Sequence, residues 1–283
     1  MSANQTHYNP ITLTLNSDDA NVVDQGQSSS CMFHLNNPIS PPNTLVDALL
    51  TLTGLQIPRT WYDVTEANNK LAFALEPNPI GYTVLTLKPG IYNARNYATA
   101  LVALFVAVDV PTMAISYDSI TNHFLFIAGV GTELTFFQNG TTMFEQIGFS
   151  FENGDVLGEI IESDRAVDLS GTRYVKLDTN IPTNNLDSSK GFSSSRSLAT
   201  VLVSVPPLGI MTYIPLNPIP IRIQNIRLSN IEVQLMDDHE RLLVMNGGRW
   251  ACTIQLVWEY RPIVYYEQDA PELTNQHKKL RYE

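Results

Sequence analysis

Charged side chains are scarce in this sequence. Asp, Glu, Lys and Arg together make up 16% of its 283 residues, against roughly 25% in an average globular protein. Asn, Thr and Ser supply much of the remaining polar surface. Protein–protein contacts are depleted in charge at their centre. This composition therefore favours a protein that packs against copies of itself over a freely diffusing enzyme.

Positive charge is the scarcer sign. The sequence has 17 Lys and Arg residues against 28 Asp and Glu residues, which gives a net charge of −11 and a pI near 4.8. Binding to phosphates needs Lys and Arg to replace counterions, and binding to anionic membrane surfaces needs the same side chains. We therefore expect neither a nucleic-acid partner nor a peripheral membrane role.

Long apolar segments suited to a bilayer are also missing. The run at residues 97–108 is too short to cross one. The longest nearly uncharged stretch, residues 199–221, is broken by prolines, which prevent a membrane helix: Pro206, Pro207, Pro215, Pro218 and Pro220. The first ten residues lack the basic and apolar regions of a signal peptide. We expect a soluble protein made in a reducing compartment, with no direct membrane insertion.

Cysteine and histidine are too few and too scattered for a metal centre. Cys31 and Cys252 are the two cysteines, and each lies in an apolar, strand-like run that predicts a small buried side chain. The five histidines form no His-x-His or His-Glu-x-x-His pattern, and no Cys-x-x-Cys occurs. Small-molecule enzymes on a jelly-roll scaffold rely on such clusters. The sequence therefore predicts no enzyme, no cofactor, and no catalytic or metal-binding residue.

One acidic run leaves two interpretations open. Asp237, Asp238, His239 and Glu240 are consecutive and offer the hard oxygen ligands that divalent cations prefer. The same four residues also fit a solvated turn after a strand. No phosphate-binding loop and no Gly-x-Ser-x-Gly motif accompanies them.

Alternating apolar and polar residues predict strands in both halves of the chain. The predicted strands are residues 11–15, 31–35, 47–57, 173–177, 200–205, 211–214, 231–235 and 250–260. Within each half no helix separates these strands, so the sheets must be antiparallel. About eight such strands favour an all-β fold, a two-sheet jelly-roll sandwich.

The middle of the chain has a different pattern. Residues 94–108 predict a helix, with Asn93 as its N-cap and Pro111 as its stop. Short strands are expected around it, and residues 142–147 are expected to form one helical turn. The short strands expected around the helix are residues 83–87, 113–117, 123–128 and 134–137. We predict a jelly-roll domain built from residues 1–66 and 164–283, and a partly helical α+β domain inserted at residues 67–163. The ends, 1–10 and 266–283, read as polar arms.

Several of these segments resemble minor capsid proteins of viruses. The block YTVLTLKPGIYNARNYATALVALF (82–105), the hairpin ISYDSITNHFLFI and the closing FEQIGF are similar to a recurring module of those proteins. The flanking segments ALLTLTGLQIPRTWYDV, VDLSGTRYVKLDTNIPTNN and WACTIQLVWEY are similar to penton proteins of virophages, polinton-like viruses and related large DNA viruses. The resemblance covers most of the chain and rests on diffuse patterning without an invariant motif.

That resemblance implies a structural virion protein without enzyme activity or cofactor. In this family a vertical single jelly roll carries an inserted domain at its outer end. Five copies close each five-fold vertex of an icosahedral capsid built of double-jelly-roll capsomers. The implied partners are the chain itself, as a homopentamer, and the neighbouring major capsid protein. The implied location is the virion, assembled in the host cell.

A second hypothesis is a β-rich spike or carbohydrate-binding surface protein. Its sugar-stacking platform would use aromatic side chains: Trp61, Tyr62, Trp250 and Trp258. Core packing is the competing interpretation. We expect Trp258 in the sandwich core, and only one of Trp250 and Trp258 on the apolar face of their strand. The basic residues near the C-terminus, His277, Lys278, Lys279 and Arg281, fit either docking on an acidic neighbour or a solvated tail.

Overall fold

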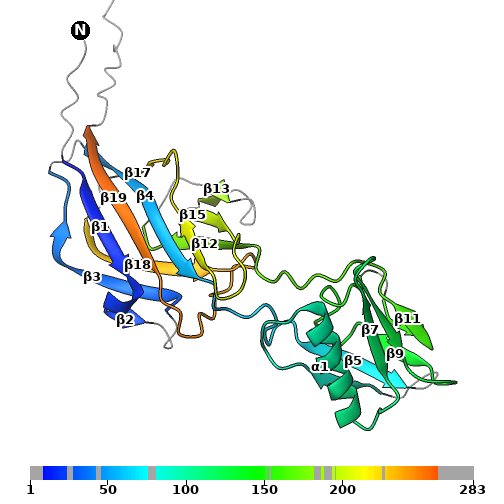
Figure 1. Ribbon diagram of the computed structural model, residues 1–283. Coiled ribbons are helices and arrows are strands. Elements are labelled where there is room, and N and C mark those ends of the chain that lie inside the picture. Colours follow the sequence, from blue (N-terminus) through cyan, green and yellow to red (C-terminus); the bar gives the residue numbers. More distant parts are fainter. Residues whose placement is uncertain are drawn as a thin grey trace, which may run out of the picture.

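The chain was examined as a computed structural model, which describes residues 9–23, 28–42, 46–75, 81–150, 152, 154–181, 186–187, 193–194, 196–224 and 227–260. Two antiparallel, five-stranded sheets form a sandwich at one end of the molecule (Figure 1). The first sheet has the order β1-β19-β4-β16, with β17 also beside β4. Its strands are β1 (Ile11–Asn16), β4 (Val46–Pro58), β16 (Ile210–Tyr213), β17 (Ile221–Gln224) and β19 (Ala251–Tyr260). A short 3-10 helix, Ser17–Asp19, follows β1.

The second sheet has the order β15-β12-β18-β3-β2. Its strands are β2 (Val22–Val23), β3 (Ser30–Ile39), β12 (Tyr174–Thr179), β15 (Ser197–Leu202) and β18 (Leu228–Met236). A separate pair, β13 (Leu186–Asp187) and β14 (Ser193–Ser194), lies between β12 and β15 in the chain.

The strand order identifies the sandwich as a jelly roll. Strands β16 and β17 pair with the two halves of β4 and act as one strand, interrupted by residues 214–220. If the short β2 is left aside, the chain order is β1, β3, β4, β12, β15, β16–β17, β18 and β19. The first sheet then has the order 1-8-3-6 and the second the order 2-7-4-5, which is the double Greek key of a jelly roll. The predicted all-β fold class is confirmed.

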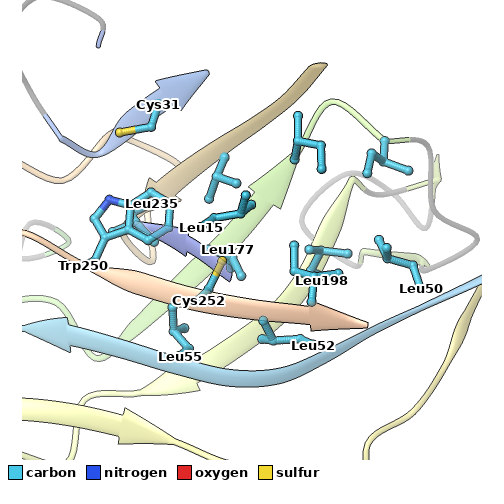
Figure 2. Close-up of a cluster of buried hydrophobic side chains, with 14 of the residues drawn as sticks. Leu15, Cys31, Leu50, Leu52, Leu55, Leu177, Leu198, Leu235, Trp250 and Cys252 are labelled. Carbon is cyan, nitrogen blue, oxygen red and sulfur yellow. The ribbon is translucent and has the colours of Figure 1, made fainter. Parts of the chain in front are cut away.

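The core between the two sheets follows from strict alternation in the strands. In β19 every second side chain from Cys252 to Trp258 is buried, and β19 pairs with β4 along its whole length. In Figure 2, Trp250 and Cys252 lie in one cluster with Leu52 and Leu55 of β4, and Cys252 is the register partner of Leu55. Leu177 of β12 and Leu235 of β18 close the core from the other sheet. Period-2 patterning therefore specifies which face of each strand is buried.

In the chain, the remaining elements lie between β4 and β12. A four-stranded sheet has the order β10-β9-β5-β6, and a three-stranded sheet has the order β11-β8-β7. The strands are β5 (Lys70–Leu75), β6 (Thr83–Thr86), β7 (Ala114–Asp118), β8 (His123–Ile127), β9 (Leu134–Phe137), β10 (Val156–Gly158) and β11 (Ile160–Glu162). Helix α1 (Ala94–Ala107) packs on this unit, and the side chain of Asn93 accepts a hydrogen bond from the N–H of Asn96 at 2.9 Å. The predicted helix and its cap are confirmed.

This unit has a hydrophobic cluster of its own, rich in phenylalanine. Phe73 of β5 meets Phe105 of α1 edge-on, with ring centroids 4.7 Å apart. Phe126 of β8 and Phe136 of β9 are 4.9 Å apart in the same geometry. Edge-to-face pairs of this kind add to the stabilisation from burial. Trp61 belongs to the sandwich cluster, whereas Val64, three residues later, belongs to the second cluster.

The structure differs from the expectations in the range of one strand, in a strand that was not expected, and in the burial of one tryptophan. The strand predicted at 200–205 runs from Ser197 to Leu202, because Leu202 already lies opposite Tyr174, the first residue of β12. Strand β5 was not predicted, since KLAFAL is nearly as apolar on one face as on the other. Trp250 is 1% exposed and Trp258 is 4% exposed. Both tryptophans therefore lie in the sandwich core, because an even sequence separation places them on one face.

Other expectations agree with the structure or lie outside it. Residues 142–147 contain one turn, closed by a hydrogen bond from the N–H of Ile147 to the carbonyl of Met143. The arms at 1–10 and 266–283, including the basic cluster at 277–281, fall almost entirely outside the described residues. Among the residues that are described, no helix is both long enough and apolar enough to cross a bilayer.

Candidate functional site: the junction cavity and the flanks of the sandwich

A cavity of about 600 Å³ lies where the sandwich meets the inserted unit. Three segments form most of it: the chain leaving β4, the segment that returns toward β12, and the turn after β18; Pro89, Glu145 and Gln146 of the inserted unit complete it. Its lining includes Trp61, Tyr62 and Leu243, with Asp63, Asp168 and Asp237 among the acidic groups.

Most of the charged groups around the cavity are already paired. Arg59 donates to Asp63 at 2.8 Å and to the carbonyl of Val205 at 2.9 Å. Arg173 donates to Asp168 at 2.6 Å. Burial raises the pKa of Asp63 despite Arg59 beside it. For Asp168 burial acts in the same direction, but hydrogen bonds from Ser170 and Arg173 outweigh it and lower the pKa. These ion pairs fix the connection between the two units.

Gly171 is required by this connection. Its φ is +63°, in the left-handed region that glycine adopts freely. A Cβ atom there would lie 2.9 Å from the Cβ of Asp63 and would also collide with the carboxylate oxygen that accepts from Arg59. The returning chain therefore passes so close to Asp63 that only glycine fits.

The acidic run after β18 forms a turn whose carboxylates already have protein partners. Asp237 accepts hydrogen bonds from the N–H groups of His239 and Arg241 at 2.9 and 2.8 Å, and from the Arg241 side chain. Glu240 accepts from Lys176 at 3.0 Å, and Asp238 accepts from the N–H of Arg173 at 3.2 Å. In the part of the chain that the structure describes, no three His, Cys, Asp or Glu side chains gather into a metal-binding group. The geometry favours the turn over the cation site.

The aromatic platform proposed for sugar binding is not assembled. Trp61, Trp250 and Trp258 are all buried in the sandwich cluster. The Nε1–H of Trp250 donates to the carbonyl of Ser28, and its ring packs edge-on against Phe33 at 6.2 Å. Tyr62, 40% exposed, is the one of the four on the surface.

The two cysteines are buried apolar side chains, as the sequence predicted. Desolvation raises the pKa of Cys31 to about 11 and that of Cys252 to about 12. A thiol with so high a pKa is a poor nucleophile at neutral pH. Neither residue has the electropositive surroundings of a catalytic cysteine.

Within the sandwich, the most exposed apolar side chains lie on one flank. We call this surface the F–G flank, because its strands are the fifth and sixth of the sandwich, F and G when the eight strands are lettered B to I. It comprises β15, the β15–β16 loop, β16 and residues 214–220. Its most exposed apolar side chains are Leu202, Leu208, Ile210, Ile214, Leu216 and Ile219. In the sequence, this flank corresponds to the long uncharged stretch at 199–221.

The fold can be compared with solved structures. The mavirus penton protein aligns with 88% of this chain and 99% of its own, at 10% identity and a TM-score of 0.50. The two proteins share a fold. A chain in the structure of the Sputnik virophage aligns over 89% of this chain and 98% of its own, at 14% identity and a TM-score of 0.44. No protein-family model matches the sequence, and no curated protein matches it.

The likeness to the mavirus protein covers the jelly roll and most of the inserted unit together. The resemblance to penton proteins that the sequence indicated is therefore confirmed at the level of the fold.

Proposed function

We propose that this chain is a structural virion protein, a penton subunit that closes the five-fold vertices of an icosahedral capsid. The observation that carries the proposal is the shared fold: 99% of the mavirus penton chain aligns with 88% of this chain, at a TM-score of 0.50. A jelly roll hosts many functions, so the fold alone is an argument by analogy.

The chemistry of the described residues supports a structural role. The charged groups around the junction cavity hold the chain in place, and both thiols are buried. We propose no enzyme activity and no cofactor. The carbohydrate-binding alternative retains only Tyr62 of its platform.

We further propose that residues 67–163 fold as a domain of their own, held at the outer end of the sandwich. Two observations support it: the two hydrophobic clusters have no member in common, and the unit leaves and re-enters the sandwich at one end (Figure 1). Limited proteolysis should cut first near 65–70 or 154–164 and release the intact sandwich and insert.

The proposal is tested by locating the chain in particles. Coexpression with the capsid proteins of the same virus, followed by cryo-electron microscopy, should show five copies around each five-fold axis. A peptide tag inserted beside Val130, which is fully exposed in the β8–β9 loop of the insert, should add density on the outside of the vertex. Particles whose vertices lack the chain, or carry it elsewhere, would contradict the proposal.

A further inference from the structure

The two long flanks of the sandwich differ from the rest of the surface in charge. Residues 197–221, which form the F–G flank, contain no Asp, Glu, Lys, Arg or His. The opposite flank, here called the B–C flank, consists of β1, β2 and β3. Residues 9–16, 20–23 and 28–42 on that side carry one such residue, His34, and two acidic residues, Asp18 and Asp19, lie in the turn between β1 and β2, where Asp18 is paired with Arg249. In a chain with net charge −11, these are the surfaces on which two copies can meet without burying unpaired carboxylates, which is costly.

The topology places the two flanks on opposite sides of one subunit. Strands β16–β17 and β15 are the edge strands of the two sheets on one side, and β1 and β2 are the edge strands on the other. Figure 1 shows β1, β2 and β3 on one side of the sandwich and β15 and β17 on the other. A ring requires contacts of this kind, in which one side of a subunit fits the other side of its neighbour.

The F–G flank has enough apolar surface for such a contact. Its six most exposed apolar side chains range from 65% exposed at Ile210 to 97% at Leu216. Burying a leucine or isoleucine side chain removes on the order of 100 Å² from water, so the six together offer on the order of 500 Å². A stable interface of standard size buries about 800 Å² per partner, and the prolines and uncharged polar groups between these residues supply the rest.

The same flank is built against strand pairing. Pro206, Pro207, Pro215, Pro218 and Pro220 interrupt it, and proline cannot donate to a ladder at an edge. The prolines lie between β15, β16 and β17, so the strand edges on this flank are short and most of its surface consists of side chains. The opposite flank offers Val22 and Val23 of β2, which are 52% and 37% exposed.

We propose that the F–G flank is the surface that binds the B–C flank of a second copy of this chain. Leu216 and Ile210 are its apolar centre, and Val22 lies on the receiving side. The closure of such contacts into a ring of five rests on the proposed function, whereas the head-to-tail contact itself does not.

The test uses the full chain and three variants. Ile210→Asp/Leu216→Asp disrupts the F–G flank, and Val22→Asp disrupts the B–C flank. Val130→Asp is the matched control, because that side chain is fully exposed in the inserted unit, away from both flanks. Circular dichroism and thermal unfolding must be unchanged in all three, so that a lost contact is not confused with a lost fold.

Native mass spectrometry and light scattering at about 100 µM, well above typical micromolar dissociation constants, give the result. The wild type and Val130→Asp should form the same ring, and each flank variant alone should be a 31.6 kDa monomer. A mixture of the two flank variants should form a two-chain complex, since each brings the intact surface that the other lacks. Only a head-to-tail contact restores a dimer in this way.

Three outcomes overturn the inference: a monomeric wild type, flank variants that assemble like the control, or loss of assembly with Ile210→Asp/Leu216→Asp alone, which indicates a symmetric contact. Particle imaging separates this from the proposed function. If the wild-type chain lies at the vertices and the flank variants lie there equally well, the contact alone is overturned. If the chain forms a ring in solution but never enters particles, the penton role alone is overturned.

Discussion

Replacing Trp258 by alanine tests whether the sandwich core stabilises its own unit independently of the insert. The side chain is 4% exposed and lies in β19 opposite Ala48 of β4. A buried tryptophan removes about 150–250 Å² from water, which at about 25 cal/mol per Å² is about 4–6 kcal/mol. Measured losses for Trp→Ala in cores are about 3–5 kcal/mol, which we take as the expected destabilisation.

The chain supplies two separate reporters for this experiment. All three tryptophans, Trp61, Trp250 and Trp258, belong to the sandwich cluster, so tryptophan fluorescence follows the unfolding of the sandwich. The one long helix described, α1, belongs to the inserted unit, so the helical circular dichroism signal follows the insert. In Trp258→Ala the other two tryptophans still report on the sandwich.

With a urea dependence of about 2–3 kcal/mol per M, the fluorescence midpoint should fall by about 1–2 M, and the helical midpoint should stay in place. Val130→Ala, on the exposed tip of the insert, should leave both midpoints unchanged. A fluorescence shift worth less than about 0.5 kcal/mol, as at exposed sites, would refute the burial argument. An equal shift of both signals would refute the independence of the two units.

Four further outcomes are expected. Gly171→Ala should cost about 1–3 kcal/mol more than the ordinary left-handed penalty, measured against Gly247→Ala, which has φ +81° and open space around it; equal losses would remove the role of the Asp63 contact. Tyr97→Phe loses the hydrogen bond to Gln146 at 3.2 Å, so the helical transition should weaken by about 1 kcal/mol, and an unchanged transition would contradict this. Both thiols should resist a thiol reagent at pH 8 until urea unfolds the sandwich. Burial raises the pKa of Cys252 from 9.0 to about 12, so on raising the pH this thiol ionises first in the unfolded chain. The free energy of unfolding should therefore fall as the pH rises above about 9, and Cys252→Ala should reduce that fall. Removing residues 266–283 should leave the fold intact and weaken incorporation into particles, and unchanged incorporation would assign those residues no docking role.

Local patterning was sufficient for most strands and for the helix. The alternation in β19 predicted its buried face, and the helix predicted at 94–108, with Asn93 as its N-cap, agrees with α1 within one residue. It failed where the pattern was two-sided or interrupted. Strand β5, KLAFAL, is buried through Leu71, Ala72 and Phe73 in succession, so it has no alternation to recognise. Residues 203–205 look like a strand, but they lie beyond the end of the ladder, since β12 begins at Tyr174 opposite Leu202, and the carbonyl of Val205 accepts from the Arg59 side chain.

The candidate surfaces depended more strongly on tertiary structure. From the sequence, Asp237 and Glu240 fitted a solvated turn, with a cation site as the open alternative. In the structure Asp237 is paired with Arg241 and Glu240 with Lys176, which favours the turn. Lys176 lies on β12, far away in the chain. Likewise Trp61, Trp250 and Trp258 could have formed a platform, and only the packing of the two sheets shows that all three are buried.

By itself the sequence determined the class of fold and the position of the helix-containing segment, because these depend on periodicities of two and 3.6 residues. It also determined the low charge of the segments that form the F–G and B–C flanks, because this depends on composition alone. Only the tertiary structure decided the strand order 1-8-3-6 and 2-7-4-5, the close approach of Gly171 to Asp63, and the gathering of Leu202 to Ile219 on one flank. The physical reason is that pairing partners such as β1 and β19 are separated by more than two hundred residues, and no local preference records which distant strand completes a sheet.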